Sequence, residues 1–217
     1  MQTGIGLYLT PTVPVPQAWL GNLSGKRVLG LASGGGQQGP LLTGWGAKVT
    51  ILDFSANQLA QERAVAEREG YHIKLLQGDM TEPLPFEDAS FDLVVHPVAN
   101  CYVQDVDLVW REAWRVLKPG GKLLAGLDNG MNFIVDPTEQ QIVNRLPYDP
   151  LHDESQRQQA EAEGAGMQFS HTIVDQIGGQ LKAGFQLLDV YEDTNSDGHL
   201  AELNIPSFWA SRSCKTV

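Results

Sequence analysis

A glycine-rich stretch and one aspartate are the residues whose types and spacing point most directly to chemistry. Gly34-Gly35-Gly36-Gln37-Gln38-Gly39 matches the pattern GxGxxG and follows an apolar run that suits a buried strand. Asp53 ends the next such run. Glycines let a ligand approach the backbone closely, and a carboxylate at the tip of a second strand accepts hydrogen bonds from ribose hydroxyls. The pattern therefore indicates a site for a nucleoside-type cofactor.

The glycine pattern alone leaves several interpretations open. A nicotinamide or flavin enzyme, an S-adenosylmethionine enzyme and a plain glycine-rich turn would each satisfy it. Asp53 alone would also serve to cap the helix that follows it. The chain contains no GxxxxGK[ST], and this excludes a P-loop.

The elements that must position these residues alternate along the first two thirds of the chain. Runs rich in Val and Leu predict strands, and apolar residues at helical spacing predict the helices between them. Ser55 and Gln58 form a capping box at the start of one helix. This alternation predicts an α/β fold with a parallel sheet. The expected strands are 26–32, 48–53, 73–77, 91–96, 122–127, 185–191 and 207–213, and the expected helices are 56–69, 105–117, 153–163 and 171–183.

The last third of the chain departs from this alternation. An acidic, Gln-rich stretch predicts a solvated helix inside an insertion, and the turn at 195–198 is too short for a helical crossover, so the last two strands should be antiparallel. We therefore expect a single domain. Its expected parts are an N-terminal arm (1–24), a cofactor-binding core (25–127), a substrate-lid insertion (128–170) and a terminal helix with an antiparallel strand pair (171–217).

Composition narrows the function classes. Among 217 residues, 15 Lys and Arg face 26 Asp and Glu, a formal charge of −11 that argues against a nucleic-acid partner. No apolar run approaches the roughly 18 residues of a membrane span, and residues 1–16 lack the features of a secretory signal, so we expect a cytoplasmic protein. Cys101 and Cys214 share no metal-ligand spacing, and we expect two reduced thiols and no metal.

Four further segments follow the glycine loop in a fixed order. They are Gln77-Gly78-Asp79-Met80, Leu84-Pro85-Phe86, Ser90-Phe91-Asp92-Leu93-Val94-Val95 and Arg115-Val116-Leu117-Lys118-Pro119-Gly120-Gly121. With the loop, this series resembles the class I S-adenosylmethionine-dependent methyltransferases, in particular the small-molecule group similar to quinone-biosynthesis methyltransferases. The resemblance covers about 25–127, roughly half of the chain, and RVLKPGG combined with SFDLV is its most specific part.

The resemblance implies a Rossmann-like, mostly parallel seven-stranded sheet with an antiparallel last strand and helices on both faces. It implies an enzyme that uses S-adenosylmethionine, releases S-adenosylhomocysteine and moves the methyl group to a small-molecule acceptor by in-line displacement. The glycine loop would surround the methionine part of the cofactor, Asp53 would hold the ribose, and Phe54, Asp79 and Met80 would contact the adenine. The implied cofactor contacts are Ala32, Ser33, Gly34, Gly35, Gly36, Asp53, Phe54, Asp79, Met80 and His96.

His96 is the candidate general base, because ligands of open α/β sheets collect at the carboxyl ends of the strands. The alternative is a polar residue that closes the strand before Pro97. Asn100 and Tyr102 are the candidate substrate contacts, and loop packing is their alternative role. A dedicated catalytic residue is not obligatory for methyl transfer, since positioning of the nucleophile supplies roughly 7–11 kcal/mol.

Two positions depart from the family pattern. Gly30 stands where the first strand usually carries an acidic residue, and Ala32 stands where the first loop glycine is expected. These departures motivate a second hypothesis, a non-catalytic protein that binds S-adenosylmethionine or S-adenosylhomocysteine. A nicotinamide oxidoreductase is a third hypothesis, which leaves RVLKPGG and GDM without a role. The acceptor, its reacting atom and the oligomeric state stay open.

Overall fold

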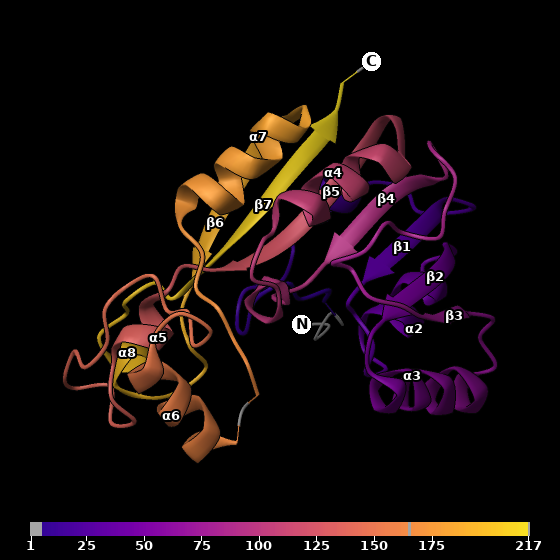
Figure 1. Cartoon of the computed structure of the whole chain (residues 1–217). Coiled ribbons are helices and arrows are strands. Elements are labelled where there is room, and N and C mark those ends of the chain that lie inside the picture. The colour runs from indigo at the N-terminus through magenta and orange to yellow at the C-terminus, as the bar shows by residue number, and fades with distance from the viewer. Residues whose placement is uncertain (1–5, 165, 217) are drawn as a thin grey trace.

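Seven apolar runs of the sequence pair into a single sheet in the computed structural model, which describes residues 6–164 and 166–216 (Figure 1). The strand order is β3-β2-β1-β4-β5-β7-β6, and β7 alone runs antiparallel to both of its neighbours. The predicted mostly parallel sheet with an antiparallel last strand is thereby confirmed. The strands are β1 Arg27–Leu31, β2 Lys48–Asp53, β3 Lys74–Gln77, β4 Phe91–His96, β5 Leu117–Asp128, β6 Phe185–Asp193 and β7 Phe208–Lys215.

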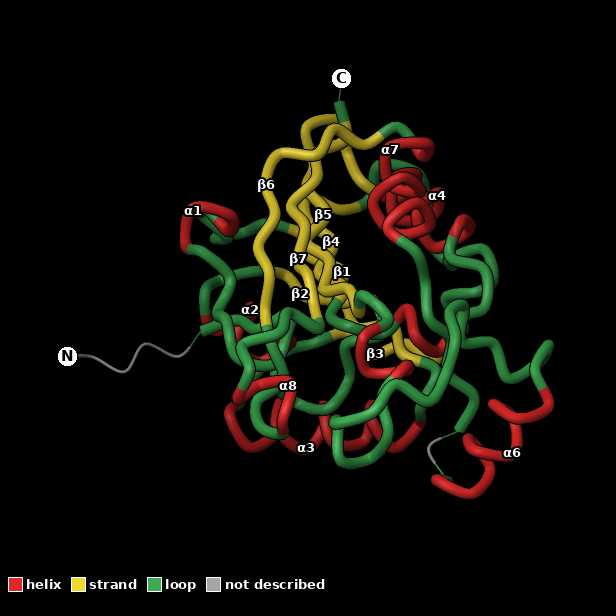
Figure 2. Tube along the Cα trace, turned by 90° about the vertical axis from the view of Figure 1, so that its left-hand side faces the viewer, coloured by secondary structure: helices red, strands yellow, loops and turns green. Residues whose placement is uncertain are grey.

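Helices cover both faces of the sheet, with α1 and α2 on one side and α4 and α7 on the other (Figure 2). The helix after β2 has the predicted bounds because Ser55 Oγ accepts a hydrogen bond from the Gln58 amide at 3.3 Å and Gly70 ends it in the left-handed conformation. The helices are α1 Gln17–Leu20, α2 Gln38–Gly44, α3 Ala56–Glu69, α4 Asp107–Val116, α5 Met131–Ile134, α6 Glu154–Glu163, α7 Gly179–Ala183 and α8 His199–Glu202, with a 3₁₀ turn η1 Asn100–Tyr102 and a π-helical turn η2 Val174–Gly178.

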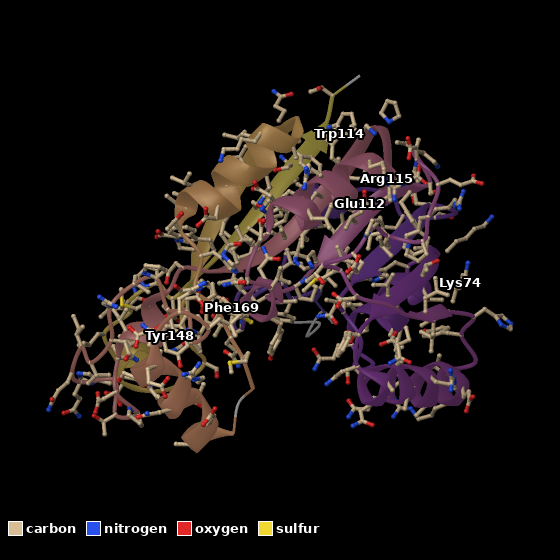
Figure 3. All side chains as sticks on the ribbon, viewed as in Figure 1. Lys74, Glu112, Trp114, Arg115, Tyr148 and Phe169 are labelled. Carbon is tan, nitrogen blue, oxygen red and sulfur yellow. The ribbon has the colours of Figure 1, made fainter. Side chains whose placement is uncertain are left out.

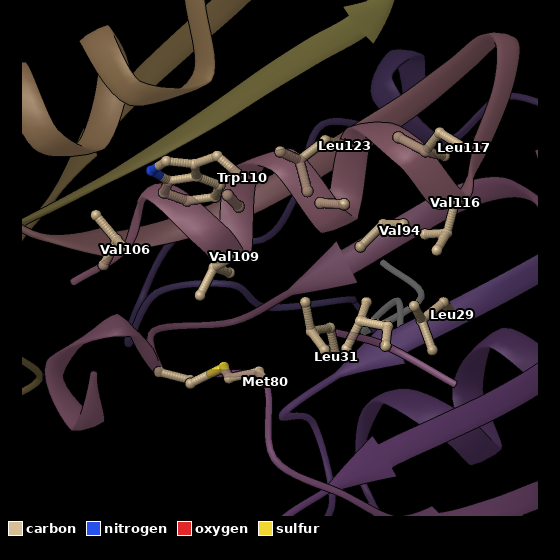
Figure 4. Close-up of a cluster of buried hydrophobic side chains, with 14 of the residues drawn as sticks. Leu29, Leu31, Met80, Val94, Val106, Val109, Trp110, Val116, Leu117 and Leu123 are labelled. Atoms are coloured by element: carbon tan, nitrogen blue, oxygen red, sulfur yellow. The ribbon is translucent and has the colours of Figure 1, made fainter. Parts of the chain in front are cut away.

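The two faces of the sheet build two hydrophobic clusters. Alternate residues of β1 point to opposite faces of the sheet. Leu29 and Leu31 belong to the first cluster, on the side of α4 (the α4 cluster), and Val28 belongs to the second cluster, on the side of α2 (the α2 cluster). Trp110 of α4 is fully buried and belongs to the first cluster (Figure 4). The N-terminal arm contributes Leu7 and Trp19 to the second cluster. The apolar periodicity of the sequence thus accounts for both layers.

The RVLKPGG segment takes a different form from the predicted one. We expected Lys118 to Gly121 to lie between a helix and a strand, but β5 already starts at Leu117. Phe91 pairs with Leu117 while Leu93 pairs with Lys122, so the residues between them bulge out of β5. Gly121 permits this bulge, because a Cβ atom there would lie 2.8 Å from the Lys118 carbonyl oxygen.

The predicted helix 171–183 divides into η2 and α7. Gln176 of η2 and Gln180 of α7 are both 1% exposed. The side-chain amide of Gln176 donates to the Asp128 carbonyl oxygen at 2.8 Å, and the side-chain amide of Gln180 donates to Ser211 Oγ at 3.0 Å. These contacts tie the segment to β5 and β7 in a way that helical periodicity does not reveal. Within the described ranges, no helix is long and apolar enough to cross a membrane.

Candidate active site

A cavity of about 550 Å³ lies where the carboxyl ends of β1, β2 and β3 meet the segment that follows β4. This is the edge at which open α/β sheets bind their ligands, and the volume is ordinary for a small-molecule site. The cavity is therefore the candidate active site. Its lining residues are Ala32, Gly34, Leu52, Asp53, Phe54, Ser55, Gln58, Gly78, Asp79, Met80, Thr81, Val98, Ala99, Tyr102 and Val103.

Asp53 connects the glycine loop to the start of α3. Its Oδ2 accepts a hydrogen bond from the Gly34 amide at 2.8 Å, and its Oδ1 accepts one from the Ser55 amide at 2.9 Å. The side chain is only 9% exposed, and it lines the cavity. The carboxylate therefore contacts Ser55, the residue that caps the helix, and also lines the candidate site.

Asp79 and Met80 line the cavity just after the end of β3. Asp79 Oδ1 accepts hydrogen bonds from the Thr81 amide at 2.8 Å and from Thr81 Oγ1 at 2.7 Å. Met80 is buried against the α4 cluster, and Phe54 is 71% exposed at the cavity rim. The cavity therefore combines two carboxylates with apolar surfaces on either side.

Arg115 of α4 holds the segment that follows Asp79 (Figure 3). Its guanidinium donates to the Leu84 and Phe86 carbonyl oxygens at 3.0 and 2.7 Å and to Glu112 at 2.6 Å. Glu112 Oε2 also accepts from the Leu84 amide at 2.7 Å. Hydrogen bonds from Arg115 lower the pKa of Glu112, which keeps this pair ionised. The arginine of RVLKPGG thus fixes the loop that directly follows the lining residues Asp79, Met80 and Thr81.

The structure brings together seven of the residues singled out from the sequence. Ser33, Gly35, Gly36, His96 and Asn100 do not line the cavity. The sequence analysis missed several lining residues that directly flank predicted ones, such as Ser55, Thr81 and Val103, and their position beside the predicted residues was the available signal. The predicted residues that line the cavity are Ala32, Gly34, Asp53, Phe54, Asp79, Met80 and Tyr102.

His96 does not stand where a general base must stand. Its side chain is fully buried, with the ring edge-on to Trp110 on the α4 side of the sheet. Nδ1 lies 2.9 Å from the Leu31 carbonyl oxygen and Nε2 lies 2.7 Å from Asn100 Oδ1. Burial lowers the pKa of His96. Its two ring nitrogens face acceptors in β1 and η1, so this residue lies between those elements and away from the cavity, which corrects the expected catalytic and cofactor roles.

His96 and Asn100 belong to a row of hydrogen bonds that ends in a carbonyl acceptor on each side. The row contains four contacts, each of which needs one hydrogen. The side chains of Asn100 and Gln176 supply one hydrogen each and a neutral imidazole supplies one, so three hydrogens serve four contacts. Only a protonated His96 ring would supply the fourth hydrogen, and burial disfavours that charged form. The row runs from the Leu31 carbonyl through His96, Asn100 and Gln176 to the Asp128 carbonyl.

Asn100 and Cys101, which follow β4, do not line the cavity either. Asn100 is 2% exposed, so it does not meet a substrate as we expected. Burial raises the pKa of the Cys101 thiol to about 12, which keeps it protonated and unreactive near neutral pH. Both cysteines are free thiols in the described part of the chain. Tyr102, which is 59% exposed, is the member of this turn that lines the cavity.

The insertion returns to the same turn. The Phe169 amide donates to the Cys101 carbonyl oxygen at 2.7 Å, and His171 Nε2 lies 3.0 Å from the Asn100 carbonyl oxygen. Figure 3 shows Phe169 between the body of the insertion, where Tyr148 lies, and the sheet. The segment 128–170 therefore contacts the turn whose last residue lines the cavity.

Comparison with known proteins agrees with this geometry. A methyltransferase domain family matches residues 29–125. The uncharacterized methyltransferase YbaJ of Bacillus subtilis is 42% identical over 216 residues, which cover 96% of this chain and 84% of that protein. A demethylmenaquinone methyltransferase of Thermobifida fusca is 39% identical over 104 residues, and this match spans less than half of either chain, 46% of this one and 43% of that one.

Solved structures share the fold. An S-adenosylmethionine-dependent methyltransferase from Mesorhizobium loti superposes with a TM-score of 0.73 over 91% of this chain and 94% of that one, at 22% identity. That likeness concerns the fold, whereas the long match to YbaJ carries the family assignment. The chain belongs to the class I S-adenosylmethionine-dependent methyltransferases, enzymes that take S-adenosylmethionine as their cofactor.

Proposed function

We propose that this methyltransferase binds its cofactor in the 550 Å³ cavity and transfers the methyl group by in-line displacement to a neutral, apolar small molecule. The observation that carries the proposal is the convergence of the glycine loop, Asp53 and Asp79 on one cavity. S-adenosylmethionine, when bound, supplies a methyl group on a positively charged sulfur.

The residues present fit an adenosyl cofactor. A Cβ atom at Gly34 would lie 2.8 Å from Gln58 Cβ and 2.9 Å from Asp53 Oδ2, so a glycine is required for the loop to meet Asp53. A Cβ at Gly78 would lie 3.1 Å from Leu52 Cδ1. Carboxylates are acceptors only, which suits the hydroxyl and amino donors of an adenosine. The two acceptor carboxylates thus support this ligand, and the two glycines allow the cavity walls to pack closely.

The chain's own side chains then have separate tasks. Asp53 would accept from ribose hydroxyls and Asp79 from the adenine amino group, while Met80 and Phe54 would pack on the adenine faces. Val98 and Val103 add apolar surface to the wall after β4 and help to exclude water. Because His96 is fully buried and does not line the cavity, rate enhancement would rest on positioning of the acceptor, which supplies roughly 7–11 kcal/mol.

The charge of the cavity supports the acceptor class. Among the lining residues, Asp53 and Asp79 are the charged ones, so an anionic acceptor would meet like charge. The formal charge of −11 opposes a nucleic-acid acceptor in the same way. Relatives that match about half of this chain are named for demethylmenaquinone and for malonyl-[acyl-carrier protein]. The first of these names gives a small molecule as the acceptor and supports the proposal, whereas the second gives a malonyl group on a carrier protein.

The first experiment is calorimetric titration with S-adenosylmethionine, S-adenosylhomocysteine and NAD at one salt concentration. We expect micromolar binding of both adenosyl ligands and none of NAD. Methyl-labelled S-adenosylmethionine is then incubated with the enzyme and, separately, an organic-solvent extract, total RNA and total protein from cells. Label in the organic extract would support the small-molecule acceptor, and label in RNA or protein would refute it. Binding without transfer to any fraction would favour the non-catalytic alternative.

A further inference from the structure

The first strand has no room for the acidic side chain that the family pattern places there. A Cβ atom at Gly30 would lie 2.2 Å from Ser33 Oγ and 2.4 Å from Ile51 Cδ1. Ser33 and Ile51 therefore fill the space beside β1. Ser33 Oγ is buried and has no hydrogen-bond partner within the described ranges, so it does not replace the missing contact to the loop.

A carboxylate reaches the glycine loop from α3 instead. Glu62 Oε2 accepts a hydrogen bond from the Gly36 amide at 2.6 Å, and the Glu62 side chain has no solvent exposure. Its Oε1 is also buried and has no hydrogen-bond partner in the part of the chain that the structure describes. Burying a carboxylate costs free energy unless hydrogen bonds or an opposite charge compensate for the lost water.

The sequence around Glu62 is adapted to this contact. A Cβ atom at Gly39 would lie 1.9 Å from Glu62 Oε1, so Gly39 is required for the carboxylate to fit under the loop. Gly36 has φ 82, a left-handed conformation that favours glycine and turns its amide toward Glu62. The third and fourth glycines of the loop thus both serve the Glu62 carboxylate.

We propose that Glu62 is the positioning residue of the cofactor loop, and that it does from α3 what no side chain of β1 can do. Through Gly36 it holds the loop in the shape that meets the cofactor, while Asp53 holds Gly34 from the other side. The inference rests on the proposed cofactor site and adds a residue that does not itself line the cavity.

The contact should depend on pH. Burial raises the pKa of Glu62, the Gly36 amide opposes this shift, and the nearby Asp53 charge at the end of β2 adds to it. Helix α2, which packs on the same loop, carries no titratable side chain. A carboxylate accepts from an amide more strongly than a protonated acid does. At pH values above the raised pKa of Glu62, the ionised side chain should therefore hold the loop. As the pH falls through that pKa, the contact should weaken and the loop should loosen.

The test compares Glu62→Gln, Glu62→Asp and wild type, with Glu67→Gln as a matched control that removes the same charge from the exposed face of α3. S-adenosylhomocysteine affinity is measured by calorimetry between pH 5 and 8. We expect Glu62→Gln to bind about tenfold more weakly or worse at pH 8 and to lose the wild-type decline in affinity toward low pH. Glu62→Asp should keep that decline, and Glu67→Gln should match wild type.

A second readout needs no cofactor. In the ligand-free protein, the Gly36 amide proton resonance should titrate with a midpoint above 4.5, the ordinary pKa of Glu, and should stay flat in Glu62→Gln. If Glu62→Gln bound S-adenosylhomocysteine with the affinity and pH dependence of wild type, the inference about Glu62 would be overturned while the proposed cofactor site would stand. Failure of wild type to bind any adenosyl ligand would overturn the proposed cofactor site and this inference with it.

Discussion

The carboxylate of Asp53 lies 2.8 Å from the backbone nitrogen of Gly34, and this contact fastens the loop after β1 to the end of β2. The other oxygen of the same carboxylate accepts from the Ser55 amide, where α3 begins. One side chain thus joins three segments that meet at the cavity. Because a carboxylate oxygen accepts more than one hydrogen bond, these contacts leave acceptor capacity for a ribose.

Asp53→Ala should weaken binding of S-adenosylhomocysteine by roughly 1.5–3 kcal/mol, the scale of a hydrogen bond to a charged group. The loss combines the ribose contact with the loosening of the loop at Gly34. Calorimetry measures it, and Asp197→Ala in the exposed turn after β6 provides a control of equal charge change. Unchanged affinity in Asp53→Ala would remove this residue from the cofactor site.

His96→Gln should act on stability, because the ring connects the Leu31 carbonyl to Asn100 in the core. We expect it to lower the free energy of unfolding by about 1–3 kcal/mol at pH 8, since it leaves buried polar groups unpaired. Urea denaturation measures this change, with the exposed His72→Gln as control. A turnover number reduced on the order of a hundredfold or more at unchanged stability would instead restore His96 as general base.

The effect of His96→Gln should also depend on pH. Burial holds the folded-state pKa of His96 below its ordinary value of 6.5, so the unfolded chain binds the proton more readily. The stability that neutral His96 contributes is therefore complete above pH 6.5 and is lost as pH falls below it. The difference in unfolding free energy between wild type and His96→Gln should accordingly shrink from pH 8 to pH 5.5. A constant difference over this range would contradict the burial effect.

Local patterns predicted the seven strands and the longer helices, but they did not predict the short helices α1, α2, α5 and α8 or the long-range contacts. The bounds of α3 could be predicted because Ser55 caps its start and Gly70 ends it, and both signals lie within the helix's own sequence. His96 contacts Asn100, and Asn100 in turn donates to Gln176, which is distant in sequence and carries no motif. Glu62 lies in a helix of mostly exposed polar residues, where nothing in the spacing sets it apart.

The location of the candidate site could be predicted in the same way, but the face on which each side chain lies could not. Motif residues at the ends of β1, β2 and β3 could be placed at one edge because parallel strands bring their carboxyl ends together. His96 ends β4 at that edge too, but its side chain points into the α4 side of the sheet. Strand position predicts the edge, whereas the face depends on register and on what packs there.

Arg115→Lys should destabilise the loop after β3, because lysine cannot reproduce the forked contacts to Leu84, Phe86 and Glu112. We expect a loss of about 1.5–3 kcal/mol in the free energy of unfolding. Arg111→Lys, at an exposed position of the same helix, is the matched control. Equal stability of the Arg115 variant and wild type would show that these contacts do not hold the loop.

Ala32→Gly should stabilise the protein and leave cofactor affinity intact or improved. Ala32 has φ 49, a left-handed conformation that costs a residue with a Cβ atom about 1–2 kcal/mol. Glycine avoids this strain but loses roughly 0.5–1 kcal/mol more to chain entropy on folding, so the net gain should be of order 0.5–1 kcal/mol. Urea denaturation and calorimetry with S-adenosylhomocysteine measure the two effects, and Ala89→Gly at φ 53 outside the cavity is a matched control for the backbone term. If Ala32→Gly gained stability but lost affinity, the Ala32 methyl group would be a direct cofactor contact, because both variants relieve the same strain and only one removes a lining atom.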